Sequence, residues 1–242
     1  MIIGSTTAGI AATSRQTRPM AFARRQHNLT ILADGNVLAT GGESSAAVNI
    51  GVDLNHPVFN AELFDTTDET WRTLGAANRV REYHSTAILL PDGRVMTGGG
   101  GICAECQRVG YLKRNVEYFE PPYLFRNDGS GEHATRPVID SAPASASYGT
   151  SYSVTSAQAG TIAKVGLVRL GAPTHGDDQG QRYVPATFTR SGTTLTVRAP
   201  ANVNQAPPGY YMLFITDSAG VPSVAKFVKL TATRPRHPRR CG

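Results

Sequence analysis

Short apolar runs separated by tight turns dominate the first half of the chain. An apolar run at residues 88–90 precedes a Pro-Asp-Gly turn at 91–93, and a second run then ends in the glycines at 98–101. Because glycine readily adopts the positive φ of a tight turn, Asp-Gly between two apolar runs predicts a β-hairpin. Tyr83 and His84 then lie where the first strand begins, at the same end of the hairpin as the glycine run.

The same pattern occurs earlier in the chain. An apolar run at 29–32 is followed by Asp-Gly at 34–35 and a glycine pair at 41–42, and the segment AELFD at 61–65 matches VEYFE at 116–120. Self-similarity at a period of roughly sixty residues, built from short strands, is typical of β-propeller blades, whose small sheets need neighbours to bury both faces. We therefore expect about two kelch-type blades in residues 20–132.

The pattern changes near residue 133, where evenly spaced strands replace the hairpin repeat. Leu195 and Val197 alternate with polar neighbours, which predicts a strand with one buried and one solvated face. The strand candidates are residues 152–155, 164–170, 183–189, 194–198, 210–216 and 225–230. About seven short strands in such a length predict an immunoglobulin-like β-sandwich at 133–231. No window shows helical periodicity, so the predicted fold class is all-β.

Composition and charge indicate which kinds of partner the chain can bind. The net charge is +6, but four arginines fall in a Pro- and Arg-rich tail, residues 232–242, that has no aromatic side chain to stack on a base. We interpret this tail as basic and disordered, and expect no nucleic-acid partner. No stretch approaches the roughly 20 apolar residues that span a bilayer. Residues 1–19 lack the basic start of a signal peptide, and we expect them to be disordered.

Cys103 and Cys106 form a Cys-x-x-Cys motif directly after the glycine run. This spacing occurs in half-sites for zinc, in redox-active pairs and in local disulfides. Zinc would need a second ligand pair, and Cys241, the third cysteine, lies in the tail. Redox motifs of the thioredoxin type open a helix in an α/β unit, whereas this motif follows a predicted β-hairpin.

The histidines differ in their sequence context. His27 repeats the position of His84 but has Gln26 beside it instead of a tyrosine, so an Arg-x-x-His sequence can be a structural feature of each blade. His56 precedes a proline in a long loop, and we interpret it as a surface residue. His175 lies in the turn-rich loop 171–179, where a histidine is ordinarily an exposed polar residue.

Three groups of residues resemble a known family. The stretch from Arg81 to Gly101 with its Cys-x-x-Cys, the Thr-His-Gly at 174–176, and PGYYMLF at 208–214 followed by GVPS at 220–223 closely resemble the galactose oxidase and glyoxal oxidase family of radical copper oxidases. The resemblance covers residue 20 to about 230. It implies that the chain is the C-terminal part of such a protein, with the last blades followed by an early-set domain, and that earlier propeller blades are missing.

The resemblance also implies a site. Copper would be the cofactor, with His84 and His175 as equatorial ligands and Tyr83 as the axial, catalytic tyrosine. It further implies a disulfide between Cys103 and Cys106, which would indicate an oxidising compartment. Since consecutive strand residues point to opposite faces, Tyr83 and His84 can share one metal only if the backbone there is irregular.

Two functional hypotheses follow. The first is a copper oxidase portion acting on a small alcohol, aldehyde or carbohydrate, extracellular or at the cell surface as the family is, and inactive as this chain because the family's radical tyrosine and its cysteine partner are missing. In agreement with that expectation, no tyrosine precedes Tyr83 and no cysteine precedes Cys103. The second is a non-catalytic kelch and sandwich protein that binds glycans or a cell-wall surface.

Overall fold

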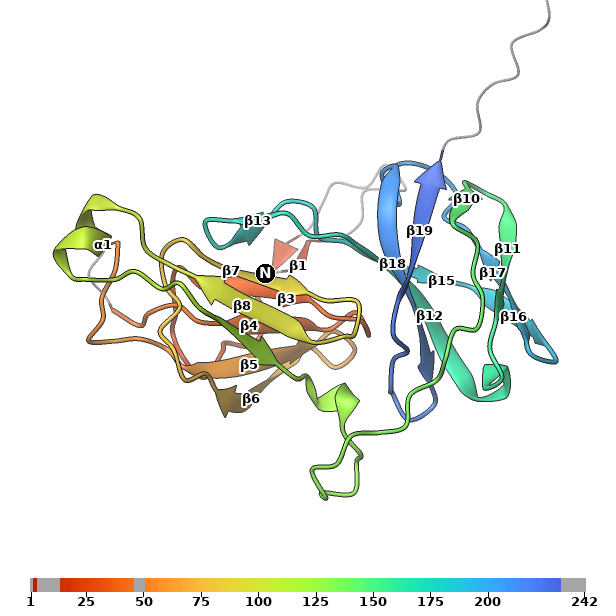
Figure 1. Ribbon diagram of the computed structural model, residues 1–242, viewed down its shortest axis with the longest axis horizontal. Coiled ribbons are helices and arrows are strands. Elements are labelled where there is room, and N and C mark those ends of the chain that lie inside the picture. The colour runs from red at the N-terminus through yellow and green to blue at the C-terminus, as the bar shows by residue number, and fades with distance from the viewer. Residues whose placement is uncertain (1, 4–13, 46–50, 232–242) are drawn as a thin grey trace, which may run out of the picture.

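The computed structural model describes residues 2–3, 14–45 and 51–231 of the chain. Strands dominate it, so the predicted all-β fold is confirmed (Figure 1). The strands are β1 Ile2–Ile3, β2 Ser14–Arg15, β3 Asn28–Ile31, β4 Val37–Thr40, β5 Asn60–Asp65, β6 Thr70–Ala76, β7 Ser85–Leu89, β8 Val95–Gly99, β9 Val116–Phe119, β10 Ser145–Ser147, β11 Ser151–Thr155, β12 Ile162–Arg169, β13 Pro173–Thr174, β14 Asp177–Asp178, β15 Tyr183–Ala186, β16 Phe188–Ser191, β17 Thr194–Arg198, β18 Gly209–Asp217 and β19 Lys226–Thr231. The helices are α1 Ala104–Arg108 and the 3-10 turns η1 Pro122–Leu124 and η2 Ala159–Thr161.

Two antiparallel sheets form the first half of the molecule. The first blade sheet has the order β3-β4-β5-β6 and the second blade sheet has the order β7-β8-β9. The Asp-Gly turns close the hairpins β3–β4 and β7–β8, with Gly35 at φ 91° and Gly93 at φ 85°, which is the conformation that glycine was expected to supply. The inner strands β3 and β7 lie side by side, and the buried Asn28 Nδ2 donates to Ser85 Oγ at 3.2 Å between them.

An arginine at the same position of the sequence repeat connects the strands within each blade sheet. In the first, Arg24 donates to the Gly41 carbonyl at 3.0 Å and pairs with Glu62. In the second, Arg81 donates to the Gly99 carbonyl at 3.1 Å and pairs with Glu117 at 3.3 Å. Each arginine therefore ties the start of its inner strand to the third strand, which explains why it recurs in the sequence repeat.

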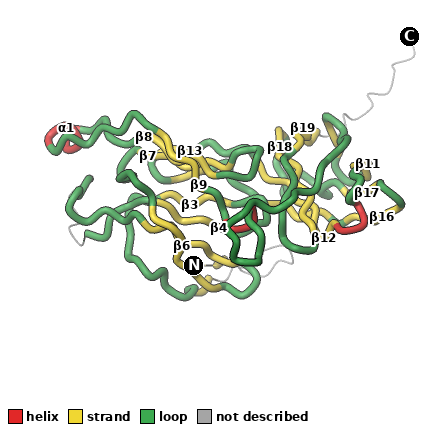
Figure 2. The backbone as a smooth tube through the Cα atoms, turned by 60° about the horizontal axis from the view of Figure 1, so that its bottom comes forward, coloured by secondary structure: helices red, strands yellow, loops and turns green. Residues whose placement is uncertain are grey.

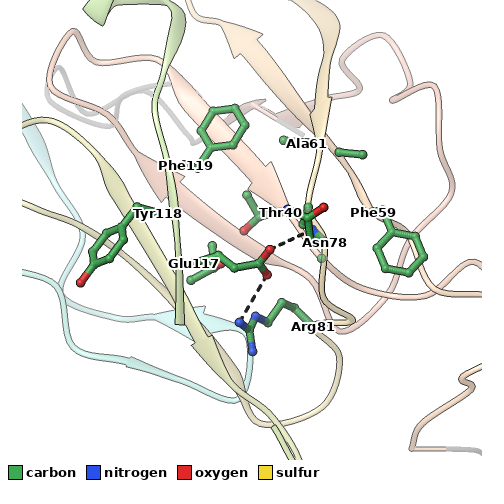
Figure 3. Close-up of a pocket in the computed structure, with 12 residues that line it drawn as sticks. Thr40, Phe59, Ala61, Asn78, Arg81, Glu117, Tyr118 and Phe119 are labelled. Atoms are coloured by element: carbon green, nitrogen blue, oxygen red, sulfur yellow. Dashed lines mark hydrogen bonds and ion pairs between the residues drawn. The ribbon is translucent and has the colours of Figure 1, made fainter. Parts of the chain in front are cut away.

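A cavity of about 110 Å³ lies between the two blade sheets (Figure 3). Thr40 and Ala61 line it from the first sheet, and Glu117 and Phe119 line it from the second. The Glu117 carboxylate bridges the gap, since it also accepts a hydrogen bond from the Asn78 backbone N–H at 2.8 Å.

The second half is a β-sandwich. One sheet has the order β10-β19-β18-β12-β15 and the other has the order β11-β17-β16. All neighbours are antiparallel except β10 and β19, which are parallel. The predicted alternation in β17 is confirmed, because Leu195 and Val197 are buried in the core between the sheets.

Strand β18 is buried on both faces. Tyr211, Leu213 and Ile215 point into the core of the sandwich, whereas Met212 and Phe214 point toward the blade sheets. A second core therefore joins the two halves of the molecule, which lie side by side in Figure 1. Its buried residues are Leu32, Ala33, Leu38, Ala61, Leu63, Ala87, Leu89, Val95, Val168, Met212, Phe214 and Ala225.

The β13–β14 hairpin leaves the sandwich and lies along the inner strands of the blade sheets. Strand β13 contacts β7 (Figure 2). Strand β14 contacts β3. Just after the hairpin, the Gln181 amide binds the edge of β3: its Oε1 accepts from the Ile31 N–H at 2.5 Å, and its Nε2 donates to the Leu29 carbonyl at 2.6 Å. The side chain thus pairs with this edge much as a neighbouring strand would.

The structure differs from the sequence expectations in two places. The candidate strand 183–189 is two strands, β15 and β16, which belong to different sheets. The chain crosses between the sheets at Thr187, whose carbonyl accepts from the Arg198 N–H at 2.8 Å. Within the segment 1–19, Ile2–Ile3 pairs with Ser14–Arg15, and Arg15 forms an ion pair with Glu69, so this part has regular structure.

The expected disorder of the chain ends and the expected absence of a membrane span concern residues that the structure describes only in part. Residues 1 and 4–13 of the N-terminal segment and the tail 232–242 lie outside the described residues. Within the described part of the chain, no helix has the length and apolar character that a bilayer crossing needs.

Candidate metal site

Tyr83 and His84 lie in a tight turn at the start of β7. The Ser85 N–H donates to the Glu82 carbonyl at 2.9 Å, which makes these two residues the central pair of the turn. His84 has φ 61°, and a positive φ at the third residue is typical of a type II turn. Because the turn breaks the alternation of a regular strand, both rings lie on one side and stack with centroids 3.9 Å apart.

His175 approaches this pair from the other half of the molecule. Its ring centroid lies 4.5 Å from that of His84 and 5.9 Å from that of Tyr83, and it meets both rings edge-on. His175 also has a positive φ, 55°. Left-handed backbone at non-glycine residues costs free energy and clusters at functional sites, and here it occurs at both histidines. The structure thus brings together the three predicted ligands.

Hydrogen bonds orient both imidazoles. His84 Nδ1 lies 2.7 Å from the Gly101 carbonyl, and since that oxygen can only accept, Nδ1 carries a proton, which in the neutral imidazole leaves the Nε2 lone pair free. His175 Nδ1 lies 2.7 Å from the Thr174 hydroxyl, and Nε2 is available as a ligand in the tautomer in which Nδ1 donates to that oxygen. An Nδ1 contact to a carbonyl or hydroxyl is the usual arrangement for a histidine that binds metal through Nε2.

Tyr111 is a residue that the sequence analysis missed. Its side chain is 1% exposed, and its hydroxyl accepts a hydrogen bond from the Glu82 N–H at 2.6 Å. A Cβ at Gly100 would overlap that hydroxyl, so the glycine run makes the room for the tyrosine. Burial raises the pKa of Tyr111 to about 12, which keeps the hydroxyl protonated. The signal in the sequence was the glycine run, whose missing side chains imply that something large packs against it.

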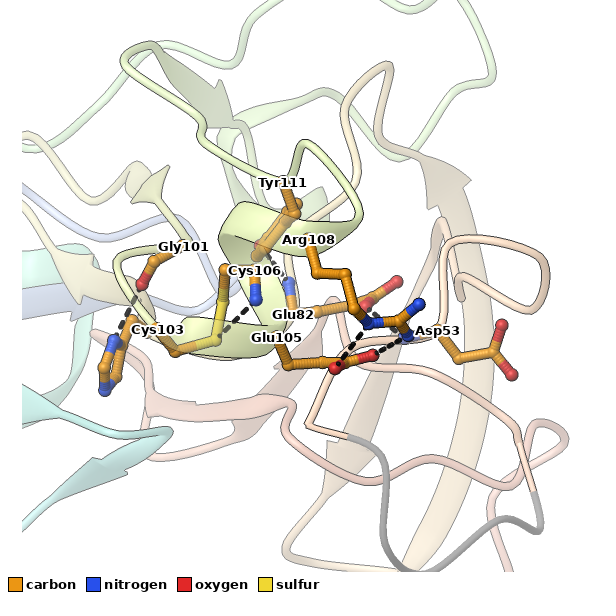
Figure 4. Close-up of a disulfide and its surroundings, with 9 residues drawn as sticks. Asp53, Glu82, Gly101, Cys103, Glu105, Cys106, Arg108 and Tyr111 are labelled. Carbon is orange, nitrogen blue, oxygen red and sulfur yellow. Dashed lines mark hydrogen bonds and ion pairs between the residues drawn. A yellow bond between two sulfur atoms is a disulfide. The ribbon is translucent and has the colours of Figure 1, made fainter.

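A disulfide joins Cys103 and Cys106 beside this turn (Figure 4). Cys103 is the N-cap of α1, and its sulfur accepts from the Cys106 N–H at 2.9 Å. Cys106 in turn offers its carbonyl to the Tyr111 N–H at 2.8 Å. The disulfide therefore belongs to the loop that supports Tyr111, and its Cα atoms are 4.9 Å apart.

The electrostatics around the site come from buried carboxylates and a neutral histidine. Burial raises the pKa of Glu82 to about 7, and the negative charge of Glu43 adds to this effect. Burial and the nearby positive charge of Arg24 lower the pKa of His27 to about 4, so this half-buried histidine is neutral at physiological pH. His56 has an exposed side chain and pairs with Asp53 at 2.8 Å, in agreement with its interpretation as a surface residue.

The donor set fits copper. Among the described residues, no group of three or more His, Cys, Asp and Glu side chains is placed to hold a metal ion, and the third ring beside the two histidines is that of Tyr83. Two neutral imidazole nitrogens and a phenol oxygen form the N,O set that suits Cu(II).

Known proteins resemble this chain in sequence. Residues 136–230 match the model of the galactose oxidase-like early set domain. A galactose oxidase from Gibberella zeae is 36% identical over 211 residues, which is 87% of this chain and 30% of that protein. An aldehyde oxidase GLOX from Vitis pseudoreticulata is 33% identical over 230 residues, 87% of this chain and 42% of that protein. The chain thus spans less than half the length of these relatives.

The fold agrees with the sequence match. A fungal alcohol oxidase of the AA5 family, solved in complex with copper, superposes with a TM-score of 0.84 at 31% identity, over 95% of this chain and 47% of the oxidase. The superposition includes both the blade sheets and the sandwich, because it covers nearly the whole chain. By sequence and by fold, the chain is similar to the C-terminal part of proteins of the galactose oxidase and glyoxal oxidase family.

Proposed function

We propose that the chain is the copper-binding C-terminal part of an oxidase that oxidises a primary alcohol or aldehyde by two electrons and reduces O2 to hydrogen peroxide. The observation that carries this proposal is the meeting of Tyr83, His84 and His175, from two halves of the molecule, with ring centroids 3.9 to 5.9 Å apart. The likeness to a copper-bound alcohol oxidase supports the choice of metal.

Each residue would have a defined role. His84 and His175 would hold the metal through Nε2, because their Nδ1 atoms contact Gly101 and Thr174. The Tyr83 oxygen would be the third ligand and would take the hydroxyl proton of a bound alcohol, which makes Tyr83 the catalytic residue of the proposal. Copper, when bound, supplies an acceptor for one electron.

Removal of two electrons from an alcohol needs a second acceptor. In the family this is a tyrosine linked to a cysteine, and in this chain no tyrosine precedes Tyr83 and no cysteine precedes Cys103. We therefore assign to this chain the metal-binding half of the chemistry. The Cys103–Cys106 disulfide supports an oxidising, extracellular location.

Copper titration of the full chain tests the proposal. We expect one Cu(II) per chain, with nitrogen hyperfine structure in the electron paramagnetic resonance (EPR) spectrum, and a loss of affinity of at least tenfold in His84→Ala and His175→Ala. His56→Ala is the matched control, since His56 is an exposed loop histidine. Tyr83→Phe should abolish the visible phenolate-to-copper absorption. Binding that is indifferent to His175→Ala would refute a site shared by the two halves.

A further inference from the structure

We propose that Tyr111 is a positioning residue for the metal site: its hydroxyl holds the turn that aims Tyr83 and His84 at one point. The proposal rests on the proposed function only in naming copper as the ion that these rings bind. Tyr111 itself touches neither the metal nor a substrate and acts through the backbone of Glu82 and through the glycine run.

The turn is held at the peptide groups of its first residue. The Glu82 N–H donates to the Tyr111 hydroxyl at 2.6 Å, and the Glu82 carbonyl accepts from the Ser85 N–H at 2.9 Å. Glu82 is 1% exposed, so water does not provide a substitute partner for its N–H. With both polar groups paired, the backbone that leads into Tyr83 and the left-handed His84 has little freedom to relax.

The same tyrosine supports the other contact that orients His84. Cβ atoms at Gly100 and Gly101 would overlap the hydroxyl and the backbone carbonyl of Tyr111, so the ring and backbone of Tyr111 pack directly on this glycine pair. Gly101 is the residue whose carbonyl binds His84 Nδ1. Tyr111 therefore contacts both the residue that precedes the Tyr83–His84 pair and the residue that sets the tautomer of His84.

Tyr111 is itself fixed by the loop that carries it. Its N–H donates to the Cys106 carbonyl at 2.8 Å, and the following loop returns to the glycine run where the Lys113 N–H donates to the Gly100 carbonyl at 3.0 Å. Val52 and Cys106 pack against the buried ring. A support with this many contacts can impose a backbone geometry on a neighbouring turn, which an isolated hydrogen bond does not do.

The test compares Tyr111→Phe with Tyr211→Phe in the full chain. Tyr211 is the matched control, because it is 0% exposed and its hydroxyl donates to the Pro207 carbonyl at 2.7 Å, within the sandwich. The first readout needs no metal: nitrogen NMR of the His84 ring at pH 8 reports which ring nitrogen carries the proton. We expect the Nδ1–H form in the unmodified chain and in Tyr211→Phe, and a mixture of both tautomers in Tyr111→Phe.

The second readout is Cu(II) binding. We expect Tyr111→Phe to weaken the affinity at least tenfold and to change the copper hyperfine splitting, while Tyr211→Phe changes neither, although in both variants a buried tyrosine loses its hydrogen bond. An unchanged His84 tautomer in Tyr111→Phe would overturn the proposal. An unfolded Tyr111→Phe chain would overturn it too, because the hydroxyl would then hold the blade sheet rather than orient the rings.

The two proposals fail separately. If the unmodified chain binds no Cu(II) but Tyr111→Phe mixes the His84 tautomers, the positioning role stands and the proposed function falls. If Cu(II) binds and Tyr111→Phe leaves both tautomer and affinity unchanged, the proposed function stands and the positioning role falls.

Discussion

Arg24 and Glu62 form an ion pair in which both side chains are completely shielded from solvent. The matching pair in the second blade sheet, Arg81 and Glu117, leaves the glutamate side chain 22% exposed. Two copies of one structural element therefore differ in burial, and burial determines what the loss of one partner costs.

Glu62→Gln should destabilise the protein far more than Glu117→Gln. Removing one partner of a buried pair leaves an uncompensated charge, at a cost of about 3–5 kcal/mol. The Glu117 side chain is 22% exposed, so solvent screens the pair and can replace part of it, and we expect about 1 kcal/mol or less for Glu117→Gln. Urea unfolding of both variants measures the difference, and equal midpoints would show that burial does not distinguish the two pairs.

Arg136→Ala should weaken the contact between the blade sheets and the sandwich. The Arg136 guanidinium donates to the carbonyls of Asp92, Pro222 and Ser223 at 2.6 to 2.8 Å, which joins the β7–β8 turn to the sandwich. Since hydrogen bonds from a charged donor contribute about 1.5–3 kcal/mol each, without simple additivity, we expect a loss of roughly 3 kcal/mol.

The control for this substitution is Arg198→Ala, which removes an exposed arginine from β17. Thermal unfolding should show a clearly lower midpoint for Arg136→Ala alone. If the two variants unfold alike, the three carbonyls find other donors and the junction does not depend on Arg136.

His27 should make the protein less stable in mild acid. The pKa of His27 is about 4 in the folded protein, below its ordinary value of 6.5, so the unfolded chain binds more protons between these values. The stability that neutral His27 contributes is present above pH 6.5 and is lost as the pH falls toward 4, by up to roughly 3 kcal/mol. The free energy of unfolding of His27→Asn should therefore fall less between pH 7 and pH 4.5 than that of the unmodified chain. Parallel curves would contradict this assignment.

The copper-loaded chain should release no hydrogen peroxide from galactose, glycerol or methylglyoxal. The physical reason is electron count, because copper alone accepts one electron while oxidation of an alcohol removes two. A peroxide assay with free copper as the blank measures this. Turnover above that blank would mean that the chain holds a second electron acceptor.

The turns and the strand alternation could be predicted from sequence because they depend on local chemistry. Asp-Gly at 34–35 and 92–93 marks both hairpins, since the required positive φ belongs to the turn itself. The break at Thr187 between β15 and β16 could not be predicted this way, because it depends on which sheet each half of the segment reaches.

The candidate site likewise contains residues that sequence motifs predict and one residue that they do not. The Tyr-His and Thr-His-Gly motifs marked Tyr83, His84 and His175, and the irregular backbone that a shared metal requires is present as a turn. Tyr111 carries no such motif. Its role arises from a hydrogen bond to Glu82 across the loop that contains α1, and nothing in the local sequence indicates which backbone amide its hydroxyl meets.

Gln181 closes the edge of β3 in the first blade sheet, and the hairpin that precedes it carries His175. His84, in contrast, belongs to the turn that starts the second blade sheet. The hairpin that carries His175 contacts both blade sheets, β13 against β7 and β14 against β3, so the separation of the two imidazoles depends on how these two sheets are placed. A change in the angle between the neighbouring sheets would shift this hairpin relative to the start of β7, so the affinity of the histidine pair for a metal would report how tightly the blade sheets are packed.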